Sequence, residues 1–166
     1  MMNIGRVMNL TLEEMSFDNC EKAYEIDRSD IPYSFVEDVD TLIETLKYGA
    51  ENDLIGHAYL AKYDEKYIAT IMIGEGIVGD ADPLEVQNRP FYRLMFFVID
   101  RAYRGKGFGT MILNEAIARI YSEFGKRPVV IEVQKENENA ARFYLRNGFV
   151  KTKYTVEDDC YYIREL

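Results

Sequence analysis

A short turn with two basic residues and three glycines is the part of the sequence best suited to chemistry. It spans Arg104–Gly109 and reads RGKGFG. Glycines let the backbone approach a ligand closely and turn its N–H groups inward, and a helix that follows would add the positive end of its dipole. Because Arg104 and Lys106 add two cations, a pyrophosphate fits this turn better than a single carboxylate does. The turn is therefore predicted to bind a diphosphate.

Two common phosphate-binding motifs do not describe this turn. A Walker P-loop needs a glycine five or six positions before Lys106, and neither Arg101 nor Asp100 is glycine. The dinucleotide fingerprint Gly-x-Gly-x-x-Gly would need its third glycine at Thr110 or Ile112. The pattern that does fit is Arg-x-x-Gly-x-Gly, placed directly after an apolar segment.

The elements on either side would position the turn. Leu94–Ile99 has no charge and no helical stripe, which is typical of a strand buried on both faces. From Thr110 onward, apolar residues recur at helical spacing. These residues are Met111, Ile112, Ala116, Ile117, Ile120, Tyr121 and Phe124. The segment is therefore predicted to be a β-α unit with the anion site at its turn.

A second pattern follows further along the chain. A predicted strand at Val129–Val133 precedes NxxAxxFY at Asn137–Tyr144 and then Gly148-Phe149. Together with the basic turn, this arrangement resembles the GNAT superfamily of N-acetyltransferases over about a third of the chain. The resemblance implies an α/β fold with a mixed, strongly twisted central sheet flanked by helices on both faces. It also implies acetyl-coenzyme A as co-substrate and an acyltransferase of class EC 2.3.1.

The resemblance assigns the cofactor to the turn and to the strand before it. In the family, this strand splays from its neighbour so that the pantetheine arm lies between the two. The backbone N–H groups of Phe97 and Ile99 are then expected to hold the acetyl carbonyl and the pantetheine amides. The residues assigned to cofactor binding are Phe97, Val98, Ile99, Arg104, Gly105, Lys106, Gly107, Phe108, Gly109, Thr110, Asn137, Ala140 and Tyr144.

Glu132 is the residue that could accept a proton from the acceptor amine. It is the sole charge in a strand otherwise suited to burial, and an unpaired buried carboxylate is costly. It lies twelve residues before Tyr144, as does the glutamate assigned as general base in the ribosomal-protein N-terminal acetyltransferases of this superfamily. The alternative is that Glu132 is solvated at the strand end or paired with an arginine.

Tyr144 is the residue expected to act as acid. By resemblance it donates a proton or a hydrogen bond to the coenzyme A sulfur, and a phenol with a pKa near 10 stays protonated until the thiolate forms. The alternative is a core tyrosine on an amphipathic helix. Asn137 lies where that helix begins, so it is either the helix N-cap, a ligand of the pantetheine or tyrosine, or both.

Composition limits the class of protein. The chain has 166 residues, 48% of them hydrophobic, and a net charge of -9. This length predicts one domain, residues 1–166. No apolar run reaches the roughly 18 residues that span a bilayer, so a soluble cytoplasmic protein without a membrane partner is expected. The negative charge argues against nucleic acid, and Cys20 and Cys160 lack metal spacing, so no metal is expected. A homodimer is left open.

The rest of the chain supplies further elements in the family's order. We predict strands at Ile4–Leu10, Ile55–Tyr63, Tyr67–Ile73, Phe149–Val156 and Cys160–Arg164. A helix is predicted from Ser16 or Asp18 to about Asp27, with Phe17, Cys20, Tyr24 and Ile26 on its inner side. Another follows, marked by Val39, Leu42, Ile43 and Leu46 before Gly49. A long loop is predicted from Gly74 to Pro90.

The positions of the acidic residues indicate which class of amine could accept the acetyl group. Carboxylates cluster in the segments that usually set specificity in the family: residues 27–40, 75–85 and 157–159. Such carboxylates would steer a polyamine, and the layout resembles bacterial spermine/spermidine acetyltransferases, although Leu94–Ile99 lacks the acidic residue expected of them. Three readings remain: an acetyltransferase for a small cationic amine, one for protein or peptide N-termini, and a non-catalytic acetyl-coenzyme A-binding module.

Overall fold

A single mixed sheet organises the protein. In the computed structural model, which describes residues 9–80 and 82–166, seven strands follow the order β1-β2-β3-β4-β5-β7-β6. The strands span β1 Leu10–Glu14, β2 Gly56–Tyr63, β3 Lys66–Glu75, β4 Tyr92–Ile99, β5 Val129–Gln134, β6 Val150–Val156 and β7 Asp159–Arg164. Neighbouring strands are antiparallel except β4 and β5, which are parallel. The predicted mixed α/β fold is therefore confirmed.

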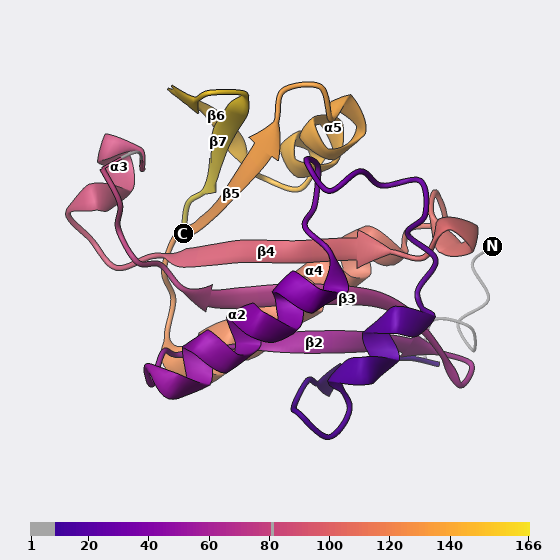
Figure 1. Cartoon of the computed structure of the whole chain (residues 1–166). Coiled ribbons are helices and arrows are strands. Elements are labelled where there is room, and N and C mark those ends of the chain that lie inside the picture. Colours follow the sequence, from indigo (N-terminus) through magenta and orange to yellow (C-terminus); the bar gives the residue numbers. More distant parts are fainter. Residues whose placement is uncertain (1–8, 81) are drawn as a thin grey trace.

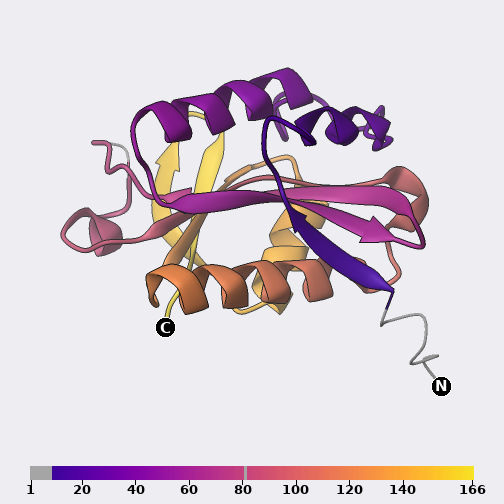
Figure 2. The same ribbon diagram turned by 90° about the horizontal axis from the view of Figure 1, so that it is seen from below.

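Helices cover both faces of this sheet, as Figures 1 and 2 show. The helical elements are η1 Cys20–Glu25, α2 Val39–Glu51, α3 Leu84–Gln87, η2 Arg101–Tyr103, α4 Phe108–Phe124 and α5 Glu138–Arg146. One face packs against η1 and α2, and the other packs against α4 and α5. No helix in the described ranges is long and apolar enough to cross a bilayer.

Helix α4 is held on the sheet by a stripe of fully or nearly fully buried side chains. They are Ile112, Leu113, Ala116, Ile117 and Ile120. The predicted members Met111, Tyr121 and Phe124 are only half-buried and flank this stripe. Burying each large apolar side chain contributes about 2 kcal/mol, so the stripe is sufficient to fix the helix and the turn at its start.

Strand β4 differs from the prediction of burial on both faces. Both of its faces do meet core clusters, but exposure alternates: Leu94 and Phe96 are buried, whereas Met95, Phe97 and Ile99 are half-buried. The reason is that β5 pairs with β4 only at Tyr92↔Val129 and Arg93↔Val130 and then diverges from it (Figure 1). The splayed strand pair expected from the family resemblance is therefore present.

A bulge interrupts β4 where it starts to part from β5. The register with β3 shifts between Thr70↔Val98 and Met72↔Met95, so two residues of β4 oppose one of β3. Phe96 has a φ of 52°, an uncommon value for a residue that is not glycine. The Thr70 hydroxyl donates to the Phe96 carbonyl at 2.8 Å and supports this conformation. A bulge takes backbone groups out of the ladder, and here those groups lie beside the splay.

In the first part of the chain, one prediction lies mostly outside the described residues and another needs correction. The strand predicted at Ile4–Leu10 lies almost wholly outside the described residues, and the described strand is Leu10–Glu14. The helix predicted from residue 16 or 18 to 27 is a short 3-10 segment. Its predicted inner residues Phe17 and Tyr24 are more than half exposed, whereas Cys20 and Ile26 are buried. Asn19 precedes it and bonds back to Ser16 and Glu14 without capping it.

The other predicted strands and helices are present, with small differences in their bounds. The hairpin of β2 and β3 turns at Asp64 and Glu65, both with positive φ, and β6 pairs with β7 as expected. Helix α2 begins at an Asp38 cap and continues two residues beyond Gly49. The long loop after β3 contains the four-residue α3, which the sequence pattern did not indicate.

Candidate active site

A large cleft opens where β4 and β5 part. Its volume is about 1120 Å³, above the range of about 300–1,000 Å³ that is usual for one small ligand. Strands β4 and β5, the start of α4, helix α5 and the segment 30–37 between η1 and α2 all line it. A cleft of this size has room for an extended cofactor and a second small molecule.

The glycine turn forms one end of this cleft. Gly105 and Gly107 have φ of 72° and 86°, and Gly107 is the N-cap of α4. A Cβ at either position would meet nothing within 4 Å, so glycine is required there for its conformation and not for space. The first N–H groups of α4 have no partner within the helix, which suits an anion.

Gly109 is needed for a different reason. A Cβ at this position would lie 3.0 Å from Phe143 Cε2 and 3.2 Å from Ile99 Cδ1. The absence of a side chain lets α4 pack closely against α5 and the end of β4. This contact holds the turn against the splayed strands.

Arg104 is engaged by the protein itself. Its Nε donates to the Ile99 carbonyl at 2.8 Å, and its Nη1 donates to Asp30 Oδ2 at 2.5 Å. Among the described residues none accepts a hydrogen bond from Nη2, although this atom is buried. The Arg104 guanidinium holds the pKa of Asp30 below its usual value. Arg104 therefore joins the loop before α2 to the glycine turn and keeps one donor unused.

Tyr144 lines the cleft from α5. The residue is 6% exposed, and its ring packs edge-on against Phe143 and Phe149. Burial alone raises the pKa of its hydroxyl above the ordinary value of 10. The hydroxyl is therefore protonated at neutral pH and able to donate a hydrogen bond into the cleft that Tyr144 lines.

Glu132 also lines the cleft, but it is not an isolated buried charge. Its side chain is 38% exposed, and its Oε1 accepts from Arg93 Nη1 at 2.8 Å. Partial burial raises the pKa of Glu132, Asp159 and Asp82 raise it further, and Arg93 opposes them. The pairing with an arginine that the sequence left open is thus present, and the carboxylate still faces the cleft.

Asn137 caps α5, with its side-chain oxygen accepting from the Ala140 N–H at 3.4 Å. Asn137 and Ala140 both line the cleft, so capping and a cofactor contact remain compatible. The structure brings most of the residues assigned to the cofactor into this cleft. Those that line it are Phe97, Val98, Ile99, Arg104, Gly105, Gly107, Gly109, Thr110, Asn137, Ala140 and Tyr144.

Two residues assigned to the cofactor lie away from the cleft lining. Lys106 is exposed, with its Nζ 5.6 Å from the centre of the Tyr103 ring. Phe108 packs on Tyr63 and Tyr103 and anchors the start of α4. Phe108 thus has a packing role in this structure, and Lys106 is left as a cation at the edge of the turn.

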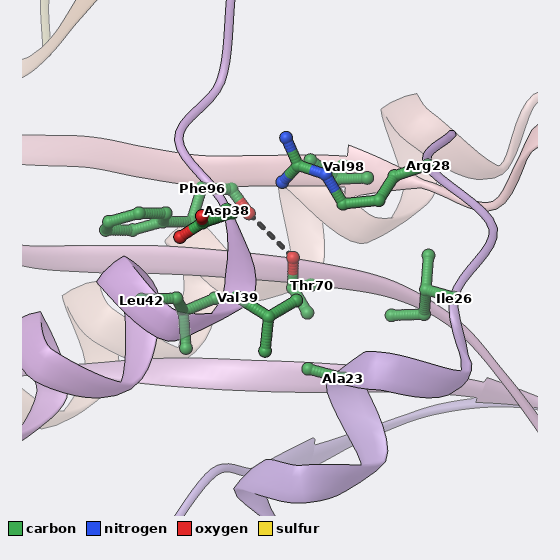
Figure 3. A pocket seen from close by; sticks show the side chains of 9 residues that line it. All are labelled: Ala23, Ile26, Arg28, Asp38, Val39, Leu42, Thr70, Phe96 and Val98. Carbon is green, nitrogen blue, oxygen red and sulfur yellow. Dashed lines mark hydrogen bonds between the residues drawn. The ribbon is translucent and has the colours of Figure 1, made fainter. Parts of the chain in front are cut away.

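A much smaller pocket lies on the other side of β4, beneath η1 and α2 (Figure 3). Its volume of about 10 Å³ is close to that of one water molecule. The Arg28 guanidinium at this pocket donates to the carbonyls of Val36 and Glu37. These hydrogen bonds hold the segment between η1 and α2, part of which borders the large cleft. The small pocket is therefore part of the packing that positions this segment.

Sequence reasoning missed three residues that shape the site. Asp100 is 1% exposed and accepts from the N–H groups of Asp27 and Ala102, which ties the loop after η1 to the end of β4. Arg93 pairs with Glu132, and Asp82 in turn pairs with Arg93. A charged residue directly at a strand end was the available signal for Asp100, whereas nothing in the sequence pattern joins Asp82 to Arg93.

The acidic loops contribute less to the cleft than their number suggests. The carboxylates that line it are Asp30, Glu37, Glu132 and Asp159. Asp30 and Glu132 are each paired with an arginine. Burial raises the pKa of Asp159, and the neighbouring Asp158 and Glu157 raise it further. Glu37 and Asp159 are therefore the carboxylates best placed to attract a second cation.

The residues present suit acetyl-coenzyme A. The first N–H groups of α4 have no partner within the helix, and Arg104 Nη2 is a buried donor without a partner in the described chain. The splay between β4 and β5 provides a slot for an extended arm. The turn, the end of β4 and α5 would together hold the cofactor.

We expect Gly109→Val to weaken coenzyme A binding at least tenfold and to lower stability by about 1–3 kcal/mol. The new side chain must push Phe143 and Ile99 away from the start of α4. Calorimetric titration with coenzyme A and thermal unfolding measure the two effects. Gly49→Ala is the control, because its Cβ has open space within α2 and should leave affinity unchanged. A stability loss with normal affinity would contradict the role of this packing in binding.

Asp30→Asn should tighten coenzyme A binding roughly threefold at low salt. Asp30 neutralises Arg104, and its removal returns that charge to the anion site. Glu37→Gln is the matched control, since it removes the same charge from the cleft lining without touching Arg104. Weaker binding by Asp30→Asn alone would mean that Asp30 aims Arg104 at the phosphates instead of competing with them.

Comparison with known proteins agrees with this geometry. The model of the family described as Acetyltransferase (GNAT) family matches residues 13–149. A curated relative, an uncharacterized N-acetyltransferase from Methanocaldococcus jannaschii, is 34% identical over 64 residues. That match covers 39% of this chain and only 28% of the length of the relative.

Solved structures share the fold across nearly the whole chain. Spermidine N-acetyltransferase from Vibrio cholerae, in complex with coenzyme A and spermine, has a TM-score of 0.64 at 16% identity over 94% of this chain and 95% of its own. PaiA N-acetyltransferase from Thermoplasma acidophilum, in complex with coenzyme A, has a TM-score of 0.67 at 17% identity over 95% and 99%. At such identities the likeness concerns the fold alone.

Proposed function

Because this chain belongs to the acetyltransferase (GNAT) family, we propose that it moves the acetyl group of acetyl-coenzyme A to a primary amine, in particular a small cationic amine such as a polyamine. One observation carries the proposal: the glycine turn, the β4 bulge, Glu132 and Tyr144 all border the same cleft. Acetyl-coenzyme A supplies an acetyl thioester; the chain's own residues must bind it, orient it and move protons.

The turn and the bulge orient the thioester. Backbone donors at the start of α4 bind the diphosphate, and the divergence of β5 admits the arm beside Phe97 and Ile99. Backbone N–H groups freed near the bulge then donate to the carbonyl oxygen as negative charge develops on it. One such donor is worth about 3 kcal/mol.

Glu132 and Tyr144 carry out the proton transfers at the acceptor amine and at the leaving sulfur. An aliphatic amine has a pKa near 10, so presenting it neutral at pH 7 costs about 4 kcal/mol unless a base takes the proton. Glu132 takes this proton, directly or through water. Tyr144, which burial keeps protonated by raising its pKa, stabilises the leaving thiolate as a hydrogen-bond donor. As the sulfur takes up a proton through this hydrogen bond, Tyr144 regains one from the amine proton that Glu132 removed, so the net transfer is from the amine to the sulfur.

The choice of a cationic acceptor rests on charge. Glu37, Glu132 and Asp159 lie on the cleft lining, and the whole chain carries a net charge of -9. A polyamine has cations several carbons apart and can meet more than one of these carboxylates. The fold shared with a spermidine N-acetyltransferase supports the same class, although shared fold does not determine the acceptor.

A peptide N-terminus is the second acceptor class. Glu132 favours it, because a glutamate in this position relative to Tyr144 resembles the base of the ribosomal-protein acetyltransferases. The exposed Tyr33 and the neighbouring Phe35, both on the cleft lining, offer an apolar surface for a first side chain. A cofactor-binding module without turnover is the third alternative.

Release of free thiol from acetyl-coenzyme A tests the proposal across polyamines, amino sugars, aminoglycoside antibiotics and peptides. We expect the highest kcat/KM with a polyamine. Preference for peptides would move the assignment to the second class. If no amine gives thiol release while calorimetry shows saturable coenzyme A binding, the chain is a non-catalytic coenzyme A-binding module.

A further inference from the structure

Arg93 links two carboxylates that belong to different parts of the chain. Its Nη1 donates to Glu132 on β5, and its Nη2 lies 2.9 Å from both oxygens of Asp82 in the loop after β3. Nη2 also donates to the Ile77 carbonyl at 3.3 Å. The Arg93 side chain is 17% exposed and lies 5.3 Å from the centre of the Phe91 ring. Its guanidinium is thus fixed from several sides.

Asp82 is the buried carboxylate of the Asp82–Arg93–Glu132 group. The residue is 4% exposed, and its Oδ2 also accepts from the Gly79 N–H at 2.7 Å. Its carbonyl accepts from Gln87 Nε2 at 2.7 Å. These bonds hold Asp82 in place independently of Arg93, so Asp82 can act as a fixed anchor for the guanidinium.

Among the described residues, four titratable or charged groups lie around the Glu132 carboxylate. Arg93 comes from β4, Asp82 from the loop before it, and Asp159 and Tyr161 from β7, where Tyr161 is the cross-strand neighbour of Glu132. Arg93 favours the charged form of Glu132, whereas Asp159 and Asp82 disfavour it. Arg93 is the positive charge in this group.

We propose that Arg93, anchored by the buried Asp82, is the positioning residue that aims the Glu132 carboxylate at the acceptor amine. The proposal rests on the proposed function, because it assigns Arg93 a role in the same proton transfer. A glutamate side chain has three rotatable bonds, and a fixed guanidinium removes most of that freedom at one oxygen. The other oxygen is left for the amine or for a bridging water.

Asp82 has a second consequence. A guanidinium that served Glu132 alone would stabilise its charge strongly and make it a poor base. Because Asp82 shares the same guanidinium, Arg93 can direct Glu132 without suppressing its basicity. Removing Arg93 and removing the charge of Asp82 should therefore affect the titration of Glu132 in opposite directions.

The first measurement needs no activity. The side-chain carboxyl of Glu132 is followed by carbon-13 NMR across pH, and its signal is assigned by its loss in Glu132→Gln. Against the wild type, Arg93→Met should move the titration to higher pH and Asp82→Asn should move it to lower pH. Shifts in the same direction, or no shift in either variant, would overturn the proposal.

The second measurement is the pH profile of kcat/KM. Arg93→Met should lose roughly tenfold at pH 7 and move the acid limb upward, whereas Asp82→Asn should move it downward. Arg93→Lys keeps the charge but cannot reach both carboxylates in the same way, so it should lose turnover with a smaller movement of the limb. It also remains informative if Arg93→Met does not fold. A pair that served folding alone would lower thermal stability in both variants without opposite pH shifts.

Failure of this inference is distinguishable from failure of the proposed function. If Glu132→Gln retains full activity, Glu132 is not the base, and the NMR shifts then report the ion-pair geometry only. If Glu132→Gln is impaired while Arg93→Met has a normal pH profile and a normal NMR titration, the base assignment stands and the role of Arg93 is wrong.

Discussion

Tyr144→Phe is expected to lower kcat about a hundredfold while the affinity for coenzyme A changes less than twofold. The substitution removes one hydroxyl from a ring that is packed against Phe143 and Phe149, so the cleft keeps its shape. What is lost is a donor for the leaving thiolate, and positioned acid catalysis typically contributes a factor of about 10²–10⁴. Steady-state thiol release and calorimetric binding separate the two quantities.

Tyr121→Phe is the matched control for this substitution. Tyr121 lies on α4 away from the cleft lining, and its hydroxyl donates to the Arg127 carbonyl at 2.6 Å. Burial raises the pKa of Tyr121 as it does that of Tyr144. The control should lose about 1 kcal/mol of stability and keep its turnover. If Tyr144→Phe also kept its turnover, Tyr144 would be a core residue, and another group would protonate the thiolate.

The conformation of the glycine turn was predictable because its determinants are local. Three glycines and two basic residues within six positions indicate an anion site wherever the segment lies, and the structure shows the positive φ values that glycine permits at Gly105 and Gly107. The same holds for α4, whose apolar period is a property of one segment. The family resemblance added the splay of β4 and β5, which depends on two strands and has no local signature.

Contacts between distant segments were not predictable. Arg93 and Glu132 are 39 positions apart, and Asp82 comes from a loop that the sequence showed only as acidic. The β4 bulge has no glycine to mark it, because Phe96 adopts positive φ with support from Thr70 on the next strand. The segment that contains the 3-10 turn Cys20–Glu25 has a helical apolar pattern in the sequence only because the exposed residues Phe17 and Tyr24 look like members of a buried stripe.

Burial of Glu132 was inferred from its apolar neighbours and proved incomplete. On β5, Glu132 is the exposed residue in a buried run, whereas Ile131 and Val133 pack in the main core and also border the cleft. The run of apolar residues gave no sign of this exposure, because Val130, two positions before Glu132, is fully buried in a separate small cluster. An arginine partner and a cleft-facing position are compatible, so the pairing does not decide against a role as base.

Glu132→Gln is expected to reduce kcat/KM at pH 7 by about a hundredfold and to recover part of this loss as pH rises. Glutamine cannot take a proton, so the variant depends on amine that is already neutral. With an amine pKa near 10, that fraction is about one in a thousand at pH 7 and grows about tenfold per pH unit. The wild type should level off earlier, above the raised pKa of Glu132.

Asp159→Asn is the control for Glu132→Gln, because it removes a negative charge from the same cleft without removing the proposed base. Asp159 lies on the cleft lining and faces Glu132 from β7, so its removal also takes one negative charge from a cationic acceptor. This control should raise KM for a polyamine and leave the high-pH plateau of kcat in place. The pH profiles of the two variants should therefore differ in slope. Only in Glu132→Gln should the rate keep rising with pH until the pH reaches the pKa of the amine. A loss in Glu132→Gln that is equal at pH 7 and pH 9 would instead make Glu132 a structural partner of Arg93, because the variant would then gain nothing from amine that arrives already neutral.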